Sequence, residues 1–260
     1  MVTRAAATYA GPMSAQVVFV HGIRTSGTMW RRQATHLQAS GVGVRSVDLP
    51  GHGTRMDEAF TLEGALATID AAVQDAAAEG PVLLVGHSMG GILATAYAGT
   101  TPSAPIAGLV AASCTSLPRG IGLAAYRVIL RVVDRLPGRG LGLTRLMLAA
   151  TLPEDTRGDF AAGGYALDAQ DAALASLAAL DLRAAVQDLK VPAWFVNGQF
   201  DQLRLHESAF RRWAPEARFT VVPRASHLVT AMRPDTFNAV LDDALVTMTA
   251  DAESGQPARA

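Results

Sequence analysis

The pentapeptide Gly86-His87-Ser88-Met89-Gly90 places a serine between two segments of different character. Residues 82–85 form a continuous apolar run typical of a buried strand, and residues 92–98 are small and apolar, as expected of a helix. A serine on such a sharp strand-to-helix turn projects its hydroxyl at the helix N-terminus, where free N–H groups favour developing negative charge. The pattern predicts that Ser88 is the nucleophile of an acyl-transfer reaction. The alternative is a tight turn without chemistry.

A serine hydroxyl is a weak nucleophile, so it needs a general base and an acid that orients this base. His227 lies on a loop directly after the strand-like residues 218–222 and is the predicted base. Asp201 comes just past the apolar residues 193–197, at the carboxyl end of a predicted strand, where sites in parallel sheets form. It is the predicted orienting acid. The stretch Ser113-Cys114-Thr115-Ser116, after the preceding predicted strand, holds no rival carboxylate.

The negative charge of a tetrahedral intermediate needs N–H donors. Residues 17–22 are typical of a strand that runs into a turn, and the N–H of Ile23 can point at the same space as the N–H of Met89. These two groups are the predicted oxyanion hole. His21 and His87 flank the two turns, where we expect them to form structural hydrogen bonds.

The chain resembles the α/β-hydrolase superfamily across nearly its whole length, in residues 21–22, 48–53, 86–91, 198–201 and 226–227. Ser88, Asp201 and His227 follow one another in the order in which that superfamily carries its triad. The chain looks most like its small bacterial serine hydrolases of the esterase, monoacylglycerol lipase and cofactor-free perhydrolase type. The resemblance implies an α/β fold with a mostly parallel central sheet, helices on both faces and a helical cap.

The alternation of strand and helix patterns predicts the same architecture. Strands are expected near residues 16–20, 43–48, 82–86, 106–112, 192–197 and 218–222, and helices near 28–39, 62–78, 89–98, 206–213 and 236–249. Little chain precedes residue 16, so the antiparallel strands that often open this fold should be short or missing. Residues 1–116 and 187–260 are predicted to form the core domain.

Residues 117–186 break the alternation, because they hold several Ala- and Leu-rich helical stretches and no strand pattern. The resemblance implies that they form the cap, which would wall in an apolar pocket and exclude water. Residues 121–136 are the clearest cap helix, and its candidate pocket or packing residues are Tyr126, Ile129, Leu130 and Val133. The alternative is that these side chains only pack.

Arginines take two different positions. Arg127, Arg131 and Arg135 recur every four residues and share one face of a helix, which is either solvated or attracts anionic substrates or a lipid surface. Arg24 directly follows the oxyanion residue Ile23, so it is a candidate to hold a substrate carboxylate at the pocket mouth. Surface exposure or a salt bridge is the alternative for Arg24.

Composition bounds the remaining functions. With 260 residues, a net charge of −1 and a pI near 6.6, the chain lacks the basic excess of a nucleic-acid-binding domain. The single cysteine, Cys114, allows no internal disulfide, and no Cys or His spacing predicts a metal site.

Residues 80–118 lack charged side chains, but glycines and prolines divide them into strand, helix and strand. We therefore expect that they belong to the core and form no integral membrane segment. Residues 1–16 lack a signal-peptide block, so a cytoplasmic location is expected.

The prediction is a capped serine hydrolase that cleaves a carboxylic ester of a small or medium apolar substrate without metal or organic cofactor. The same triad serves thioesterases, lactonases, C–C bond hydrolases and hydroxynitrile lyases, and these alternatives stay open. A non-catalytic ligand receptor is a further alternative of a different class. The sequence predicts no oligomeric state.

Overall fold

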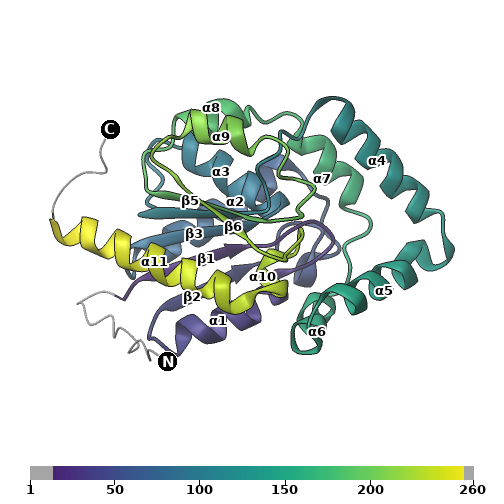
Figure 1. The fold of residues 1–260 in the computed structure, drawn as a ribbon, viewed down its shortest axis with the longest axis horizontal. Helices are drawn as coiled ribbons and strands as arrows, with labels where there is room; N and C mark the ends of the chain where they lie inside the picture. The colour runs from purple at the N-terminus through teal and green to yellow at the C-terminus, as the bar shows by residue number, and fades with distance from the viewer. Residues whose placement is uncertain (1–13, 255–260) are drawn as a thin grey trace.

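The computed structural model describes residues 14–254, which form a six-stranded sheet with helices on both faces (Figure 1). The strand order is β2-β1-β3-β4-β5-β6, and every neighbouring pair is parallel. The strands are β1 (Gln16–Val20), β2 (Gly43–Val47), β3 (Val82–His87), β4 (Gly108–Ala112), β5 (Ala193–Gly198) and β6 (Arg218–Val222). All six expected strands are present, and the predicted α/β-hydrolase fold is confirmed.

The central strands are buried on both faces, which explains their continuous apolar sequences. In β1, Val18 and Val20 belong to one hydrophobic cluster, while Val17 and Phe19 belong to the cluster on the opposite face. Successive side chains of a strand point to opposite faces, so a single strand supplies both halves of the core.

Helices cover each face of the sheet (Figure 1). One cluster contains side chains from α2 (Leu62–Ala77), α3 (Met89–Thr100), α8 (Leu182–Gln187) and α9 (Glu207–Trp213). The other contains side chains from η1 (Gly27–Trp30), α1 (Arg31–Gln38), α10 (Val229–Met232) and α11 (Pro234–Ser254). A short helix, η2 (Gly53–Arg55), lies in the loop after β2.

The structure describes every residue between β4 and β5. This part of the chain forms helices and no strand. It holds α4 (Gly120–Asp134), η3 (Pro137–Gly140), α5 (Leu141–Thr151), α6 (Glu154–Ala162) and α7 (Gln170–Leu177), followed by α8. Figure 1 shows α4, α5 and α6 on the right, beyond the sheet. By contrast, α8 packs against α3 and α9 as part of the layer on the sheet.

The helices α4 and α5 expose much of their apolar surface. Most of the large hydrophobic side chains that are exposed in the described chain belong to α4, α5 and the turn between them: Tyr126, Val128, Ile129, Val132, Leu136, Leu143, Leu146 and Met147. Ile129 is 58% exposed, so the expectation that it packs is wrong.

The arginines of α4 face α7 and form ion pairs. Arg127 and Arg131 both bind Asp171, at 2.9 and 3.1 Å, and these groups remain largely in contact with solvent. Exposed ion pairs contribute about 0–1 kcal/mol each. The solvated interpretation of this arginine face fits Arg127 and Arg131.

Several helix boundaries differ from the sequence prediction. The helix expected at residues 28–39 is divided into η1 and α1, because Ser26 caps a tighter first turn by accepting a hydrogen bond from the N–H of Thr28. The last helix is longer than residues 236–249, since Pro234 supplies a first helical position that needs no N–H partner. The expectation about opening strands concerns a segment that lies almost wholly outside the described residues. Among residues 14–254, none of the helices is both long and apolar enough to span a membrane.

Candidate active site

Ser88 occupies the turn between β3 and α3 in a strained backbone conformation. Its φ is 54° and its ψ is −117°, a region that non-glycine residues rarely adopt. Such strain typically costs about 1–3 kcal/mol and persists only where the surrounding packing imposes it. The serine is therefore held at the predicted turn by its neighbours.

The two glycines of the pentapeptide make this turn sterically feasible. A Cβ atom on Gly86 would lie 2.3 Å from the carbonyl oxygen of Gly90, and a Cβ atom on Gly90 would lie 2.3 Å from the carbonyl oxygen of Val20. Both approaches are impossible for a real side chain. Glycine at these positions lets α3 pack closely against β3 and the end of β1.

The structure brings the three predicted triad residues together in one chain of hydrogen bonds. The Nε2 atom of His227 lies 2.9 Å from the hydroxyl oxygen of Ser88, and its Nδ1 atom lies 3.0 Å from Oδ1 of Asp201. An ionised carboxylate only accepts hydrogen bonds, so Nδ1 carries the proton and Nε2 accepts from Ser88. This is the geometry and tautomer that a serine nucleophile with a histidine base requires.

Asp201 is stabilised in its ionised form although its side chain is buried. Burial acts to raise the pKa of this carboxyl. The hydrogen bond from His227 and the electrostatic attraction between the two side chains, with contributions from the Ser113 hydroxyl and the N–H of Leu203, outweigh burial and hold the pKa of Asp201 below its ordinary value. The Leu203 N–H donates to Oδ1 at 2.8 Å. Asp201 therefore stays charged and acceptor-only toward His227.

The two predicted oxyanion donors lie on turns that pack against each other. A Cβ atom built on Gly22 would lie 3.5 Å from Cβ of Ser88, so the turn after β1 contacts the serine directly. Among the described residues, neither the N–H of Ile23 nor that of Met89 donates to a protein acceptor. Met89 is the first residue of α3, where N–H groups lack intrahelical partners.

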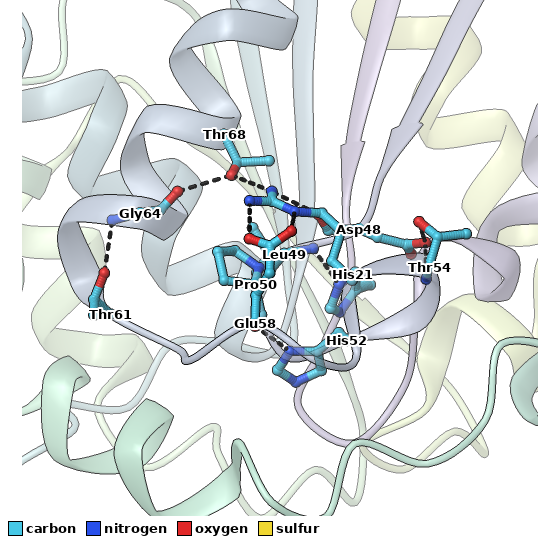
Figure 2. A network of polar contacts seen from close by, with 11 residues as sticks. His21, Asp48, Leu49, Pro50, His52, Thr54, Glu58, Thr61, Gly64 and Thr68 are labelled. Atoms are coloured by element: carbon cyan, nitrogen blue, oxygen red, sulfur yellow. Dashed lines mark hydrogen bonds and ion pairs between the residues drawn. The ribbon is translucent and has the colours of Figure 1, made fainter.

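A buried polar network supports the turn after β1 (Figure 2). The Nε2 atom of His21 accepts a hydrogen bond from the N–H of Leu49 at 3.0 Å, and its Nδ1–H donates to the carbonyl of Gly22 at 2.8 Å. This pattern requires neutral imidazole. Burial, assisted by the positive charge of His52, lowers the pKa of His21 to about 3. His21 therefore forms the structural hydrogen bonds that were expected of it.

Asp48 lies next to Leu49 in this network and binds the loop after β2 through Thr54 (Figure 2). Its carboxylate accepts hydrogen bonds from the N–H of Gly27 at 2.7 Å and from the N–H and hydroxyl of Thr54 at 2.8 and 2.9 Å. These bonds outweigh burial and lower the pKa of Asp48. The network ties the loop after β2 to the chain that follows Ile23.

His87 connects the serine turn to the histidine loop. Its Nε2–H donates to the carbonyl oxygen of His227 at 2.8 Å. Burial, together with the charge of His227, lowers the pKa of His87 to about 4, so this ring is a neutral donor. The expected structural hydrogen bond of His87 is confirmed, and its partner is the backbone of His227.

The three candidate substrate-binding residues take different positions. Leu130 is buried in the same hydrophobic cluster as Met89 and Ile92, and Ile23 packs against this cluster. Tyr126 lies one turn earlier on α4 and is 37% exposed. Arg24 follows Ile23 in a left-handed conformation with φ of 62°. The turn after β1 and α4 therefore lie near each other, as the electrostatic influence of Arg24 on Tyr126 also indicates.

Ser113 is the site residue that the sequence did not identify. It is fully buried at the end of β4, adopts a φ of 55°, and its hydroxyl helps to lower the pKa of Asp201. The position of Ser113 in the sequence could have indicated this proximity. Ala112 pairs with Val196, so the ends of β4 and β5 are neighbours, and Asp201 follows β5.

Residues 17–240 match the model of the Alpha/beta hydrolase family. A segment of 89 residues is 36% identical to Lipase LipV of Mycobacterium tuberculosis (strain ATCC 25618 / H37Rv). This segment covers 34% of the chain and 33% of the lipase, so the chain spans only about a third of that relative.

Solved structures share the fold over most of the chain. A thermophilic esterase from Thermogutta terrifontis, with malate bound, superposes with a TM-score of 0.72 and 25% identity, over 93% of this chain and 97% of the esterase. A carboxylesterase from the thaumarchaeon Nitrososphaera gargenis gives a TM-score of 0.75 over 92% of both chains, and at 18% identity it shows the fold alone.

Proposed function

Since the chain belongs to the alpha/beta hydrolase family, we propose that it is a serine hydrolase that cleaves a carboxylic ester through an acyl-enzyme on Ser88. The observation that carries this proposal is the continuous hydrogen-bond chain from Ser88 through His227 to the ionised Asp201. The lipase and esterase relatives support ester hydrolysis as the general activity.

In the first half-reaction, His227 removes the proton of Ser88 as its oxygen attacks the ester carbonyl. Asp201 keeps the imidazole in the productive tautomer and stabilises the imidazolium that forms. The N–H groups of Ile23 and Met89 receive the oxyanion, and each such donor is typically worth about 100-fold or more in rate. His227 then gives its proton to the leaving alcohol.

In the second half-reaction, His227 activates water against the acyl-enzyme, and collapse of the second tetrahedral intermediate releases the acid and regenerates Ser88. These residues supply nucleophile, base, acid and oxyanion donors, so the proposed mechanism requires no metal or organic cofactor. The helices between β4 and β5, with Leu130 on α4, act as a cap that covers a small or medium apolar substrate.

The test combines covalent labelling with turnover. The protein is incubated with a fluorophosphonate and analysed by peptide mass spectrometry, and hydrolysis of p-nitrophenyl esters of graded acyl length is measured in parallel. The expected result is modification of Ser88 and turnover that falls by about 10⁴-fold or more in Ser88→Ala and His227→Ala. Ser208→Ala, at an exposed serine of α9, is the matched control and keeps both labelling and turnover.

Near-wild-type hydrolysis in Ser88→Ala would contradict the mechanism. Absence of both labelling and turnover in the wild-type protein would contradict ester hydrolysis and favour a lyase or a ligand receptor on this fold.

A further inference from the structure

Arg24 has an unusual backbone conformation in the turn after β1. Its φ of 62° lies in the left-handed region that favours glycine, and Arg24 follows directly after Ile23 in the turn that contacts Ser88. An arginine in this conformation costs free energy that a glycine or asparagine would avoid. The chain therefore places an arginine two residues after the glycine that approaches Ser88, in spite of backbone strain.

The guanidinium group of Arg24 has buried donors that nothing in the described chain satisfies. Both Nε and Nη2 are inaccessible to solvent and form no hydrogen bond with any residue from 14 to 254. A buried charged donor without a partner is strongly unfavourable. These two atoms form one edge of the guanidinium group, and this edge is the one that binds a carboxylate through two parallel hydrogen bonds.

Asp134, the acidic group that acts electrostatically on Arg24, forms no hydrogen bond with it. Asp134 on α4 attracts Arg24 electrostatically but forms its ion pair with Arg139, whose Nη2 lies 2.9 Å from Oδ2. Arg139 in turn opposes the positive charge of Arg24. Burial is the largest influence on Arg24 and lowers its pKa, as expected of a charge without a direct counter-ion.

The surroundings of Arg24 place this free edge between the oxyanion turn and the cap helix. Tyr126 and Asp134 of α4 both interact electrostatically with Arg24, while Ile23 and Leu130 contribute to the same apolar cluster. A group bound here would lie against this apolar cluster, which also contains Met89, the residue after Ser88.

We propose that Arg24 binds a second carboxylate of the substrate, so that the natural substrate is a half-ester of a short dicarboxylic acid. The inference rests on the proposed ester hydrolysis and specifies its acyl group. The acyl group remains bound through both half-reactions, whereas the alcohol leaves after the first. Arg24 therefore acts in both half-reactions if it binds the acyl group.

The experiment compares two methyl esters of equal size, monomethyl glutarate and its neutral counterpart methyl glutaramate, by acid release in a pH-stat. Wild-type protein is expected to prefer the charged ester in kcat/KM. In Arg24→Gln this preference should fall by about 100-fold, as for the loss of one partner of a buried charge pair. Arg24→Lys keeps the charge without the two-donor edge and should give an intermediate preference.

Arg127→Gln removes a positive charge from the cap at a position paired with Asp171, and it should leave the preference unchanged. A wild-type protein without preference, or an unchanged preference in Arg24→Gln, would overturn the proposal. The labelling of Ser88 and the hydrolysis of p-nitrophenyl esters test ester hydrolysis separately, so failure of one inference is distinguishable from failure of the other.

A second measurement covers the case in which Arg24→Gln does not fold. Glutarate and the neutral glutaramide are compared as inhibitors of p-nitrophenyl butyrate hydrolysis by the wild-type protein. Competitive inhibition by glutarate at concentrations where glutaramide has no effect supports the proposal, and equal inhibition by both compounds overturns it.

Discussion

The Nε2 atom of His87 lies 2.8 Å from the carbonyl oxygen of His227, so the residue next to Ser88 holds the backbone of the histidine that contacts the Ser88 hydroxyl. His87 and His227 are 140 residues apart in the sequence and meet only because β3 and the loop after β6 end at the same edge of the sheet. This bond fixes the distance between Ser88 and His227 from the backbone side.

Loss of this bond should impair turnover more than binding. We predict that His87→Leu lowers kcat for p-nitrophenyl butyrate by about 10- to 100-fold, the effect of a displacement near 1 Å in a reacting geometry, with a smaller change in KM. His87→Gln keeps an N–H donor and should recover most of this loss. Steady-state kinetics on both variants, with circular dichroism as a check of folding, provides the comparison. Wild-type kcat in His87→Leu would show that the bond does not position the base.

Alanine substitutions at Gly90 and Gly122 should change the free energy of unfolding in opposite directions. Gly90→Ala places a Cβ atom 2.3 Å from a backbone oxygen, so it should destabilise the protein by more than about 2 kcal/mol and remove activity. Gly122→Ala in α4 meets no atom within 4 Å and should stabilise the protein by about 0.5 kcal/mol, because alanine favours the helix. Urea denaturation of both variants measures the two free energies. Equal stabilities would contradict the close packing of α3 against β1.

The buried neutral imidazole of His21 predicts a dependence of stability on pH. Its pKa is about 3 in the folded protein and near 6.5 in the unfolded chain, so below pH 6.5 the unfolded state binds more protons. The stability contributed by neutral His21 is complete above pH 6.5 and is lost as the pH falls toward 3. Between pH 7 and pH 5 this loss amounts to about 2 kcal/mol.

In His21→Gln, an amide that cannot titrate replaces the imidazole ring. The decrease in the free energy of unfolding from pH 7 to pH 5 should therefore be about 2 kcal/mol smaller in this variant than in the wild-type protein. Urea denaturation at both pH values gives the comparison. An identical fall in both proteins would mean that His21 is not the titrating group.

The elements were predictable because their signals are local. The alternation of Val17, Val18, Phe19 and Val20 between two buried faces leaves an uninterrupted apolar run in the sequence, and the turn glycines follow from sterics at Ser88. The residues that were predicted as a triad are brought together for the same reason, since each follows a strand and all parallel strands end at one edge.

What the sequence could not specify depends on contacts between distant segments. Residues 121–136 are apolar on more than one face, so the pattern did not show that Leu130 is buried while Ile129 is exposed. In the same way, nothing local to Arg24 indicates that its guanidinium edge lacks a partner, because this depends on Asp134 being bound to Arg139.

The strands β4 and β5 are hydrogen-bonded neighbours, yet residues 113–192 lie between them in the chain. The entropy of closing a loop grows only with the logarithm of its length, and a doubling costs about 0.6 kcal/mol. Lengthening the chain between the helices α4 to α6 therefore costs the sheet little, provided that Leu130, Leu148 and Phe160 keep their places in the two core clusters and each strand keeps its register. Under the proposed function, the loops of this insertion are where substrate preference can vary at the lowest thermodynamic cost, because the strand ends that carry Ser88, Asp201 and His227 stay unchanged.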